Sequence, residues 1–593
     1  MAIVGVAFML SVFAGVLVGT WLRPDGSAPA AAANACDAVT LRVYASPDIA
    51  GVLSDRIAEF RGNAEDECDA FQVIADSSAD VVDDLADGWD QSADGPPPDV
   101  WIPEATSWVQ LLRATETGAT LVGDDTPSIA RSPTVVAMPR PMAKVLGWPR
   151  AQLSWADLAD LISEPEGWKA HGHEEWGPFK FGLTTPRRSA AAAQSIISVG
   201  AALGGVWADE LSAESVQRDR VRLNLLQLER SVARTDNTTL EQLSGLRRAD
   251  RAGVGLDFVS AFPIDERQVW RYNAGLPPGT ADDDMRLSKP KVPLAAWYPP
   301  EGSLALDYPF VVLEGDWVDE ERRERALEFL AILQGEETQN RLLELGFRGA
   351  DGEVGDVLRR AKGIAVDRAG TQVQPPRPKV VQQVLNTWDT VSQRTNTLAV
   401  IDVSGSMAEA ARGTDGTRLD VATAAAAEAV KLAVDDSGFG LWEFSTDLAR
   451  EHHRELVAMG PLGENVGTVT RRQAVEDALA AMQPRHDTAL YETVLAAYRE
   501  AKRHFDPERV NDIVLLTDGR QDNPDGTLGL ERTLSQLRKL ADSERPVGLI
   551  AIGYGGQADL NALERMTKAV GGQAYGAVRA TDVREIILQT LTG

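Results

Sequence analysis

The feature that most constrains the fold is a polar stretch directly after a short apolar run. The run Thr397–Ile401 reads TLAVI, which is typical of a buried strand in a parallel sheet. Asp402, Ser404 and Ser406 follow it and should lie in the loop at the carboxyl end of that strand. In an open α/β sheet, ligands bind in the crevice outside the carboxyl ends of the strands. The stretch therefore predicts a ligand site with one carboxylate and two hydroxyl groups.

Two further segments extend this predicted site. A second apolar strand, Ile513–Leu516, runs into the tripeptide TDG and adds Asp518 to the same edge of the sheet. His486–Tyr491 opens a predicted helix with Thr488 near its first turn. The three segments together resemble the metal-ion-dependent adhesion site (MIDAS) of the von Willebrand factor A family, also called the integrin I-domain fold. The resemblance covers residues 395–593 and implies a doubly wound, Rossmann-like α/β domain.

The resemblance also implies a divalent cation. Mg²⁺ takes six oxygen ligands at about 2.0–2.1 Å and keeps several water molecules, so a few hydroxyl groups and solvent suit it. In the family pattern Ser404, Ser406 and Thr488 bind Mg²⁺ (or Mn²⁺) directly, whereas Asp402 and Asp518 act mainly through water. Neutral hydroxyl ligands leave much of the charge uncompensated, so an Asp or Glu of a protein partner can replace a water molecule. The alternative is a serine-rich turn that has no metal.

Length and composition indicate the number and class of domains. A chain of 593 residues is too long for one hydrophobic core and should form two or three domains. Its 44% apolar and 25% charged residues are typical of soluble globular domains. The formal charge of −29 and the lack of a basic stripe argue against nucleic acid as a partner.

Residues 1–23 predict a signal peptide or a membrane anchor, followed by an alanine-rich spacer at 24–38. Ala2–Leu22 has no charged residue and is long enough to span a bilayer as a transmembrane helix. Secretory segments normally begin with Lys or Arg, and none precedes this one, which suggests a start upstream of Met1. We therefore expect the protein on the extracytoplasmic side of the cell membrane, or secreted if the segment is cleaved.

The two cysteine residues favour a disulfide bond. Cys36 precedes the predicted strand Val39–Ala45, and Cys68 precedes the predicted strand Phe71–Ala75. Neighbouring parallel strands would begin close together, which would bring the two thiols within reach. In an exported chain, a disulfide is favoured over a metal or catalytic pair.

Residues 39–373 alternate short apolar strands with helices, which predicts a parallel sheet wrapped by helices. The phrases PDVWIPEATSW, SPTVVAMPRPM, FGLTTPRRSAAAA and LDYPFVVLEGDW resemble the bacterial extracellular solute-binding proteins, two-lobed receptors that usually serve importers. Late in this region, Ala252–Phe258 is interpreted as a strand. A linker at 374–394, marked by PPRP, should connect this region to the second domain.

In the solute-binding fold, ligands lie between the lobes, near helix N-termini whose free amide groups and dipole favour an anion. Thr185 should cap a helix that begins at Pro186, next to two arginines. The resemblance therefore implies a small polar or anionic solute. Ordinary roles in caps and turns are the alternative for each candidate residue. The residues that we expect to line the site are Ser46, Thr106, Ser132, Thr185 and Arg188.

These features predict an extracytoplasmic, membrane-anchored binding protein whose A-type domain uses Mg²⁺ to bind an acidic residue of a protein partner, with a solute-binding region as a sensor. The alternative is a substrate-binding receptor of an ABC transporter, in which the A-type domain docks the receptor to a membrane complex. We expect no enzyme, because the sequence has neither the G-x-S-x-G nor the H-E-x-x-H motif. A hydrolase of cell-wall material would need a carboxylate pair that the sequence does not locate.

Overall fold

The structure is a computed structural model that describes residues 40–592 except 63–70, 217–220, 222–224, 227, 230, 279–286, 371–372, 447, 449–451, 523–527 and 557. The predicted membrane segment lies outside these residues, and so do Cys36 and Cys68. No helix within the described part of the chain is long and apolar enough to cross a membrane. The anchor and the disulfide therefore remain predictions.

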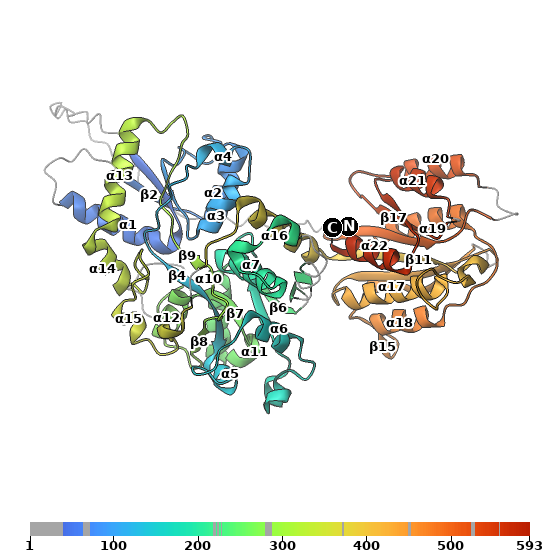
Figure 1. Cartoon of the computed structure of the whole chain (residues 1–593), viewed down its shortest axis with the longest axis horizontal. Helices are drawn as coiled ribbons and strands as arrows, with labels where there is room; N and C mark the ends of the chain where they lie inside the picture. Colours follow the sequence, from blue (N-terminus) through green and yellow to red (C-terminus); the bar gives the residue numbers. More distant parts are fainter. Residues whose placement is uncertain are drawn as a thin grey trace, which may run out of the picture.

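The first lobe, at the upper left of Figure 1, is built on a four-stranded sheet with the strand order β10-β3-β1-β2. Three strands of this sheet are parallel: β1 (Leu41–Ala45), β2 (Phe71–Ala75) and β3 (Val100–Ile102). Strand β10 (Val311–Val312) is antiparallel to β3. Leu41 pairs with Phe71, so β1 and β2 begin side by side, as the disulfide prediction requires. The principal helices of this lobe are α1 (Pro47–Gly62), α2 (Ser78–Asp87), α3 (Thr106–Arg113), α13 (Glu320–Gln334) and α14 (Glu336–Glu344).

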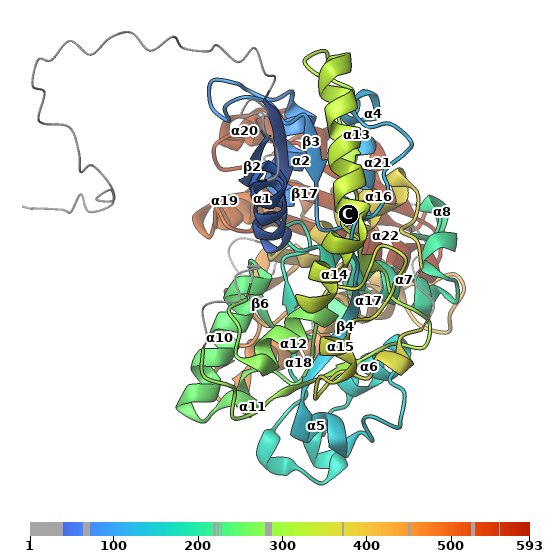
Figure 2. The ribbon, with the colours of Figure 1, turned by 90° about the vertical axis from the view of Figure 1, so that its left-hand side faces the viewer.

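The second lobe lies below the first in Figure 2 and contains an antiparallel sheet instead of a continuation of the predicted parallel one. All eight residues of its central strand, β4 (Ser132–Pro139), are buried, so its sequence lacks the alternation that would distinguish an antiparallel strand. β4 pairs with β7 (Phe262–Asp265), β8 (Leu294–Trp297) and β9 (Ala305–Leu306), while β5 (Phe181–Thr184) and β6 (Val232–Asp236) form a separate parallel pair.

The helices of the second lobe correct one further prediction. The predicted strand Ala252–Phe258 is wrong, because these residues contain the end of one helix and a second short helix. Gly253 separates them with a left-handed φ of +84°, which glycine adopts without steric cost. The helices are α5 (Arg140–Val145), α6 (Trp155–Ser163), α7 (Ala190–Gly204), α8 (Ala213–Val216), α10 (Thr239–Ala252), α11 (Gly255–Phe258) and α12 (Glu266–Ala274).

Helix α16 (Pro378–Ser392) lies between the lobes and the C-terminal domain (Figure 1). Proline occupies its first position, where the missing N–H is not needed. Its apolar face, which includes Val384 and Trp388, belongs to the same hydrophobic core as the first lobe and α7. The helix also contacts α22 (Ala580–Thr592) of the C-terminal domain. This segment is therefore packed into the solute-binding region rather than simply spanning the distance between domains.

The C-terminal domain is a doubly wound sheet, as predicted, with the strand order β13-β12-β11-β16-β17-β18. The edge strand β13 (His453–Pro461), which the sequence did not predict, is antiparallel to its neighbour. The parallel strands are β11 (Thr395–Asp402), β12 (Gly438–Phe444), β16 (Val510–Thr517), β17 (Gly548–Tyr554) and β18 (Gln573–Ala577). The helices are α17 (Arg418–Leu432), α18 (Arg471–Ala481), α19 (Leu490–Arg503), α20 (Leu530–Leu540), α21 (Leu560–Lys568) and α22.

The central strand β11 explains how the two helical layers are held. Ala399 and Ile401 pack into the core beneath α17, α18 and α22, whereas Leu398 and Val400 pack into the core beneath α19, α20 and α21. Alternate residues of a strand point to opposite faces, so one apolar run supplies both cores. Because the strand is fixed on both faces, the polar residues that follow it are held at the edge of the sheet.

Candidate functional site

The first candidate site lies at the carboxyl edge of the C-terminal sheet. We call it the rim, and its predicted residues are Asp402, Ser404, Ser406, Thr488 and Asp518. Asp402 is the last residue of β11 and is fully buried. One of its carboxylate oxygens accepts the backbone N–H of Ser404 at 2.8 Å. The other accepts the hydroxyl of Thr517, the last residue of the neighbouring strand β16, at 2.5 Å. Asp402 therefore connects the ends of two strands and positions the loop that follows.

Three rim side chains form a continuous chain of oxygens. The Ser404 and Ser406 hydroxyls lie 3.1 Å apart, and the Ser406 hydroxyl donates to Asp518 Oδ1 at 2.7 Å. Ser404 and Asp518 are buried, and Ser406 is half-buried. Ser406 and Asp518 are separated by 112 residues in the sequence, so the tertiary fold brings them together as the strand order predicts.

Thr488 borders the same edge but precedes its helix. α19 begins at Leu490 after the cap residue Ala489, so Thr488 lies two residues before the helix, near its first turn as predicted. The rim loop is held to the loop before α19, because the Gly405 N–H donates to the carbonyl of His486 at 2.8 Å. A Cβ atom on Gly519 would lie 2.6 Å from the Thr488 hydroxyl oxygen. Glycine at 519 therefore leaves the space that this hydroxyl needs to approach the rim.

Arg418 is a rim residue that the sequence did not indicate. It is the first residue of α17, and its guanidinium contacts Asp518 Oδ2 at 2.5 Å and Glu409 at 2.6 Å. A guanidinium so close to a buried carboxylate compensates its charge. No local pattern separates this arginine from the other arginines of the chain, because its role depends on a residue 100 positions away.

The chemistry of the rim fits a hard divalent cation. Its oxygens come from two carboxylates and three hydroxyl groups, which are ligand types that Mg²⁺ accepts. The pKa of Asp402 is raised to about 7, chiefly by burial; the hydrogen bonds from Thr517 and Ser404 lower it, and the nearby Asp518 adds to the rise. The described part of the chain has no cluster of three or more His, Cys, Asp or Glu side chains suited to a metal. Any cation at the rim would therefore depend on the serine and threonine hydroxyls.

The second candidate site is a cavity of about 250 Å³ that residues of both lobes line. Of the residues predicted to bind a solute, Ser46 and Arg188 line it. Ser132 is buried and bonds to Asp265, which itself lines the cavity. Because Arg188 also pairs with Asp80 of α2, an ion pair connects the two lobes beside this cavity.

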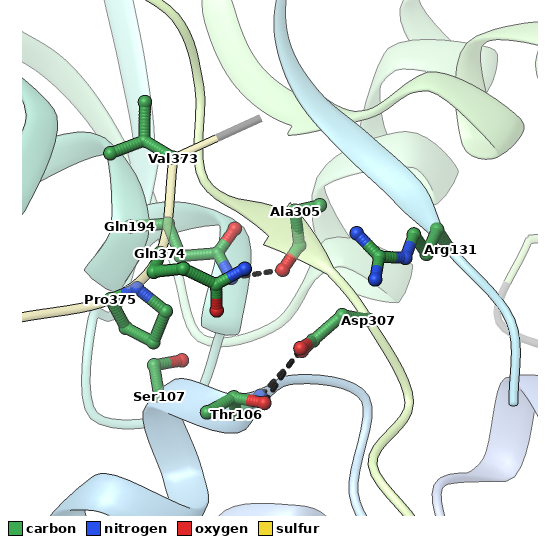
Figure 3. Close-up of a pocket in the computed structure, with 9 residues that line it drawn as sticks. All are labelled: Thr106, Ser107, Arg131, Gln194, Ala305, Asp307, Val373, Gln374 and Pro375. Carbon is green, nitrogen blue, oxygen red and sulfur yellow. Dashed lines mark hydrogen bonds between the residues drawn. The ribbon is translucent and has the colours of Figure 1, made fainter. Parts of the chain in front are cut away.

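Two predicted cleft residues have other roles. Figure 3 shows Thr106 in a separate small pocket of about 10 Å³, where its N–H and hydroxyl donate to Asp307 at 2.7 and 2.6 Å. Thr185 does not cap a helix, so that prediction is wrong. α7 begins at Ala190 and is capped by Ser189, which lines the cavity. The backbone carbonyl of Thr185 accepts the Arg188 N–H in the preceding turn.

The chain has two lobes on separate sheets with a cavity between them, and a doubly wound domain with a polar rim follows. These features define a two-lobed binding protein that carries an adhesion-type domain. The chain belongs to the bacterial extracellular solute-binding protein family, whose model matches residues 41–348, more than half of the chain. The von Willebrand factor type A domain model matches residues 397–521. The predicted resemblances to the two families are confirmed, and the metal-ion-dependent adhesion site stays a prediction. The first family is extracytoplasmic, and both domain types are typically non-catalytic binding modules.

Several known proteins and solved structures are similar to this chain or to parts of it. The uncharacterized protein Rv1836c of Mycobacterium tuberculosis H37Rv is 24% identical over 550 residues, which cover 90% of this chain and 73% of the relative. A periplasmic thiamin binding protein is 12% identical with a TM-score of 0.39, covering 60% of this chain and 97% of that one. A von Willebrand factor type A structure from Catenulispora acidiphila is 17% identical with a TM-score of 0.26, covering 34% of this chain and 42% of that one.

Proposed function

We propose that this protein is a membrane-anchored, extracytoplasmic binding protein that binds a protein partner through its rim and a small polar solute through its cavity. In this proposal Ser404, Ser406 and Thr488 bind Mg²⁺ or Mn²⁺ directly, and Asp402 and Asp518 hold its water ligands. The bound ion would supply an open coordination position for an Asp or Glu carboxylate of the partner. The observation that carries this proposal is the continuous chain of rim oxygens from Ser404 through Ser406 to Asp518.

Contacts around two adjacent arginines support the role of the solute-binding region as a sensor. Arg188 lines the cavity and pairs with the opposite lobe. Arg187 donates to Asn386 of α16 at 2.7 Å and also pairs with Asp389 of the same helix. α16 leads directly into β11, whose last residue is Asp402. A movement of this arginine turn on solute binding would therefore act directly on the helix that precedes the rim strand.

Calorimetric titration of the full chain with Mg²⁺ tests the rim. We expect one weak site that a chelator empties. Ser406→Ala should weaken Mg²⁺ binding by about tenfold or more, because it removes a direct ligand. Asp402→Ala is a less specific test, because Asp402 also joins two strand ends.

Ser543→Ala provides the matched control. Ser543 is exposed in the same domain, between α20 and β17, so its loss should leave Mg²⁺ binding unchanged. A pull-down from native membranes with and without chelator then tests the partner, which the Ser406→Ala variant should fail to retain. Equal Mg²⁺ binding by wild type and Ser406→Ala would show that the rim is only a turn.

A further inference from the structure

Two oxygen acceptors at the start of α12 line the cavity with unused bonding capacity. Asp265 caps this helix and is 3% exposed. Its Oδ1 accepts the Ser132 hydroxyl at 2.7 Å and the Gln268 N–H at 3.3 Å, and neither bond uses Oδ2. Gln268 is also 3% exposed, and its side-chain oxygen is buried without a hydrogen-bond partner in the described structure. Because a buried acceptor without a donor is unfavourable, this pair of residues favours a ligand that donates hydrogen bonds.

Two helix N-termini at the cavity, those of α1 and α12, carry carboxylates, whereas α7, which also begins at the cavity, has a serine cap and no acidic residue in its first turn. Asp265 caps α12, and Asp48 lies in the first turn of α1, where it accepts the Ser46 hydroxyl at 2.7 Å. Glu104, also on the wall, accepts the indole N–H of Trp108 at 2.8 Å. Asp48 and Asp265 therefore occupy two helix N-termini that would otherwise attract an anionic solute, and Glu104 adds a third carboxylate to the wall.

Positive charge at the cavity is limited and already paired. Arg188 is the one basic residue among those that line the cavity in the described part of the chain, and it pairs with Asp80. Arg267 is fully buried behind the wall, with its guanidinium 3.9 Å from Asp48. An anion would therefore meet three carboxylates, whereas a cation would find both unused acceptors.

We propose that the cavity between the lobes binds an organic cation whose amine or guanidine head donates hydrogen bonds to Asp265 Oδ2 and the Gln268 side-chain oxygen. This inference rests on the proposed solute-binding function and gives the chemical class of the solute. The N–H groups of such a head would satisfy Gln268, and its charge would be compensated by Asp265. The serine and threonine hydroxyls of the wall would contact the remainder of the molecule.

The electrostatics of Asp265 support this assignment. Its pKa is raised to about 6, chiefly by burial; the Ser132 hydrogen bond and Arg267 lower it, whereas Asp48 adds to the rise. Burial also raises the pKa of Glu104. A bound cation stabilises the charged carboxylate, so binding should release protons near pH 6 and should become tighter from pH 5 to pH 7.

Calorimetry of the full chain tests the inference with a panel of cations that carry N–H donors: putrescine, agmatine and spermidine. Citrate serves as the anionic probe and 1,4-butanediol as the neutral one. We expect at least one cation to bind and neither of the other probes to do so. Asp265→Asn keeps a helix-capping side chain but removes the charge, so it should weaken cation binding by about tenfold or more and remove most of its pH dependence.

Asp319→Asn is the matched control. Asp319 caps α13 in the same way, by accepting the Arg322 N–H at 2.9 Å, but it does not line the cavity. This variant should bind cations like wild type. Binding of citrate or butanediol without any cation would overturn the cation assignment and leave the solute-binding function standing. Unchanged cation affinity in Asp265→Asn would overturn the assigned site, and failure of every probe would count against both proposals.

Discussion

Replacing the buried carboxyl of Asp512 should change how the stability of the C-terminal domain depends on pH. Asp512 lies in β16, paired with Thr397 and Gly548 of the adjacent strands. Its Oδ1 is buried without a hydrogen-bond partner, and among the described residues its carboxyl forms no ion pair. The pKa of Asp512 is raised from 3.8 to about 7, because the effect of burial exceeds the opposing effect of a hydrogen bond with Thr397.

The magnitude follows from this difference in pKa. Between pH 4 and pH 7 the folded state keeps a proton on Asp512 that the unfolded state has lost. The free energy of unfolding should therefore be highest at pH values below 3.8, the pKa of the carboxyl in the unfolded chain. It should fall as the pH rises to the folded-state pKa of about 7. The gap between 3.8 and about 7 corresponds to at most about 4 kcal/mol. From pH 5.5 to pH 7.5 the loss should be about 2 kcal/mol.

Hydrogen exchange measured by mass spectrometry on peptides from β11 and β16 reports the opening free energy of this domain within the full chain. Asp512→Asn removes the titrating group. From about pH 5.5 to pH 7.5, the opening free energy of wild type should therefore fall by about 2 kcal/mol more than that of the Asp512→Asn variant. Asp477→Asn, at an exposed position of α18, should follow wild type. Equal pH dependence in Asp512→Asn and wild type would refute the reasoning.

The remaining predictions concern the disulfide, the rim and a buried ion pair. Titration of unfolded, unreduced protein should find no free thiol, because Cys36 and Cys68 are expected to form a disulfide, and two reactive thiols would contradict it. Arg418→Gln should tighten Mg²⁺ binding in calorimetry by about threefold or more, because it removes a positive charge beside the rim, and weaker binding would contradict the proposed metal position. Glu266→Gln should lower the free energy of unfolding in denaturant titration by about 3 kcal/mol, because it leaves the buried guanidinium of Arg348 without its bidentate partner, and a change below about 1 kcal/mol would contradict this.

Local sequence patterns determined the two strands that carry the rim. The predicted strands Thr397–Ile401 and Ile513–Leu516 lie within β11 and β16. Apolar periodicity predicts these elements because each one buries a face that its own sequence defines. The rim was predictable for the same reason, since Asp402, Ser404 and Ser406 directly follow a strand that is apolar on both faces.

The tertiary structure decided the direction of the strands in the second lobe, because the fully buried β4 has no polar face to indicate it. It also decided the charge around both sites. Arg418 reaches Asp518 across 100 residues, and Ser132 reaches Asp265 across 133 residues. Such pairs leave no local pattern, because hydrogen bonding, burial and pKa depend on which distant elements the fold packs together. The sequence by itself therefore determined where ligand sites could form, and packing determined which charges those sites present.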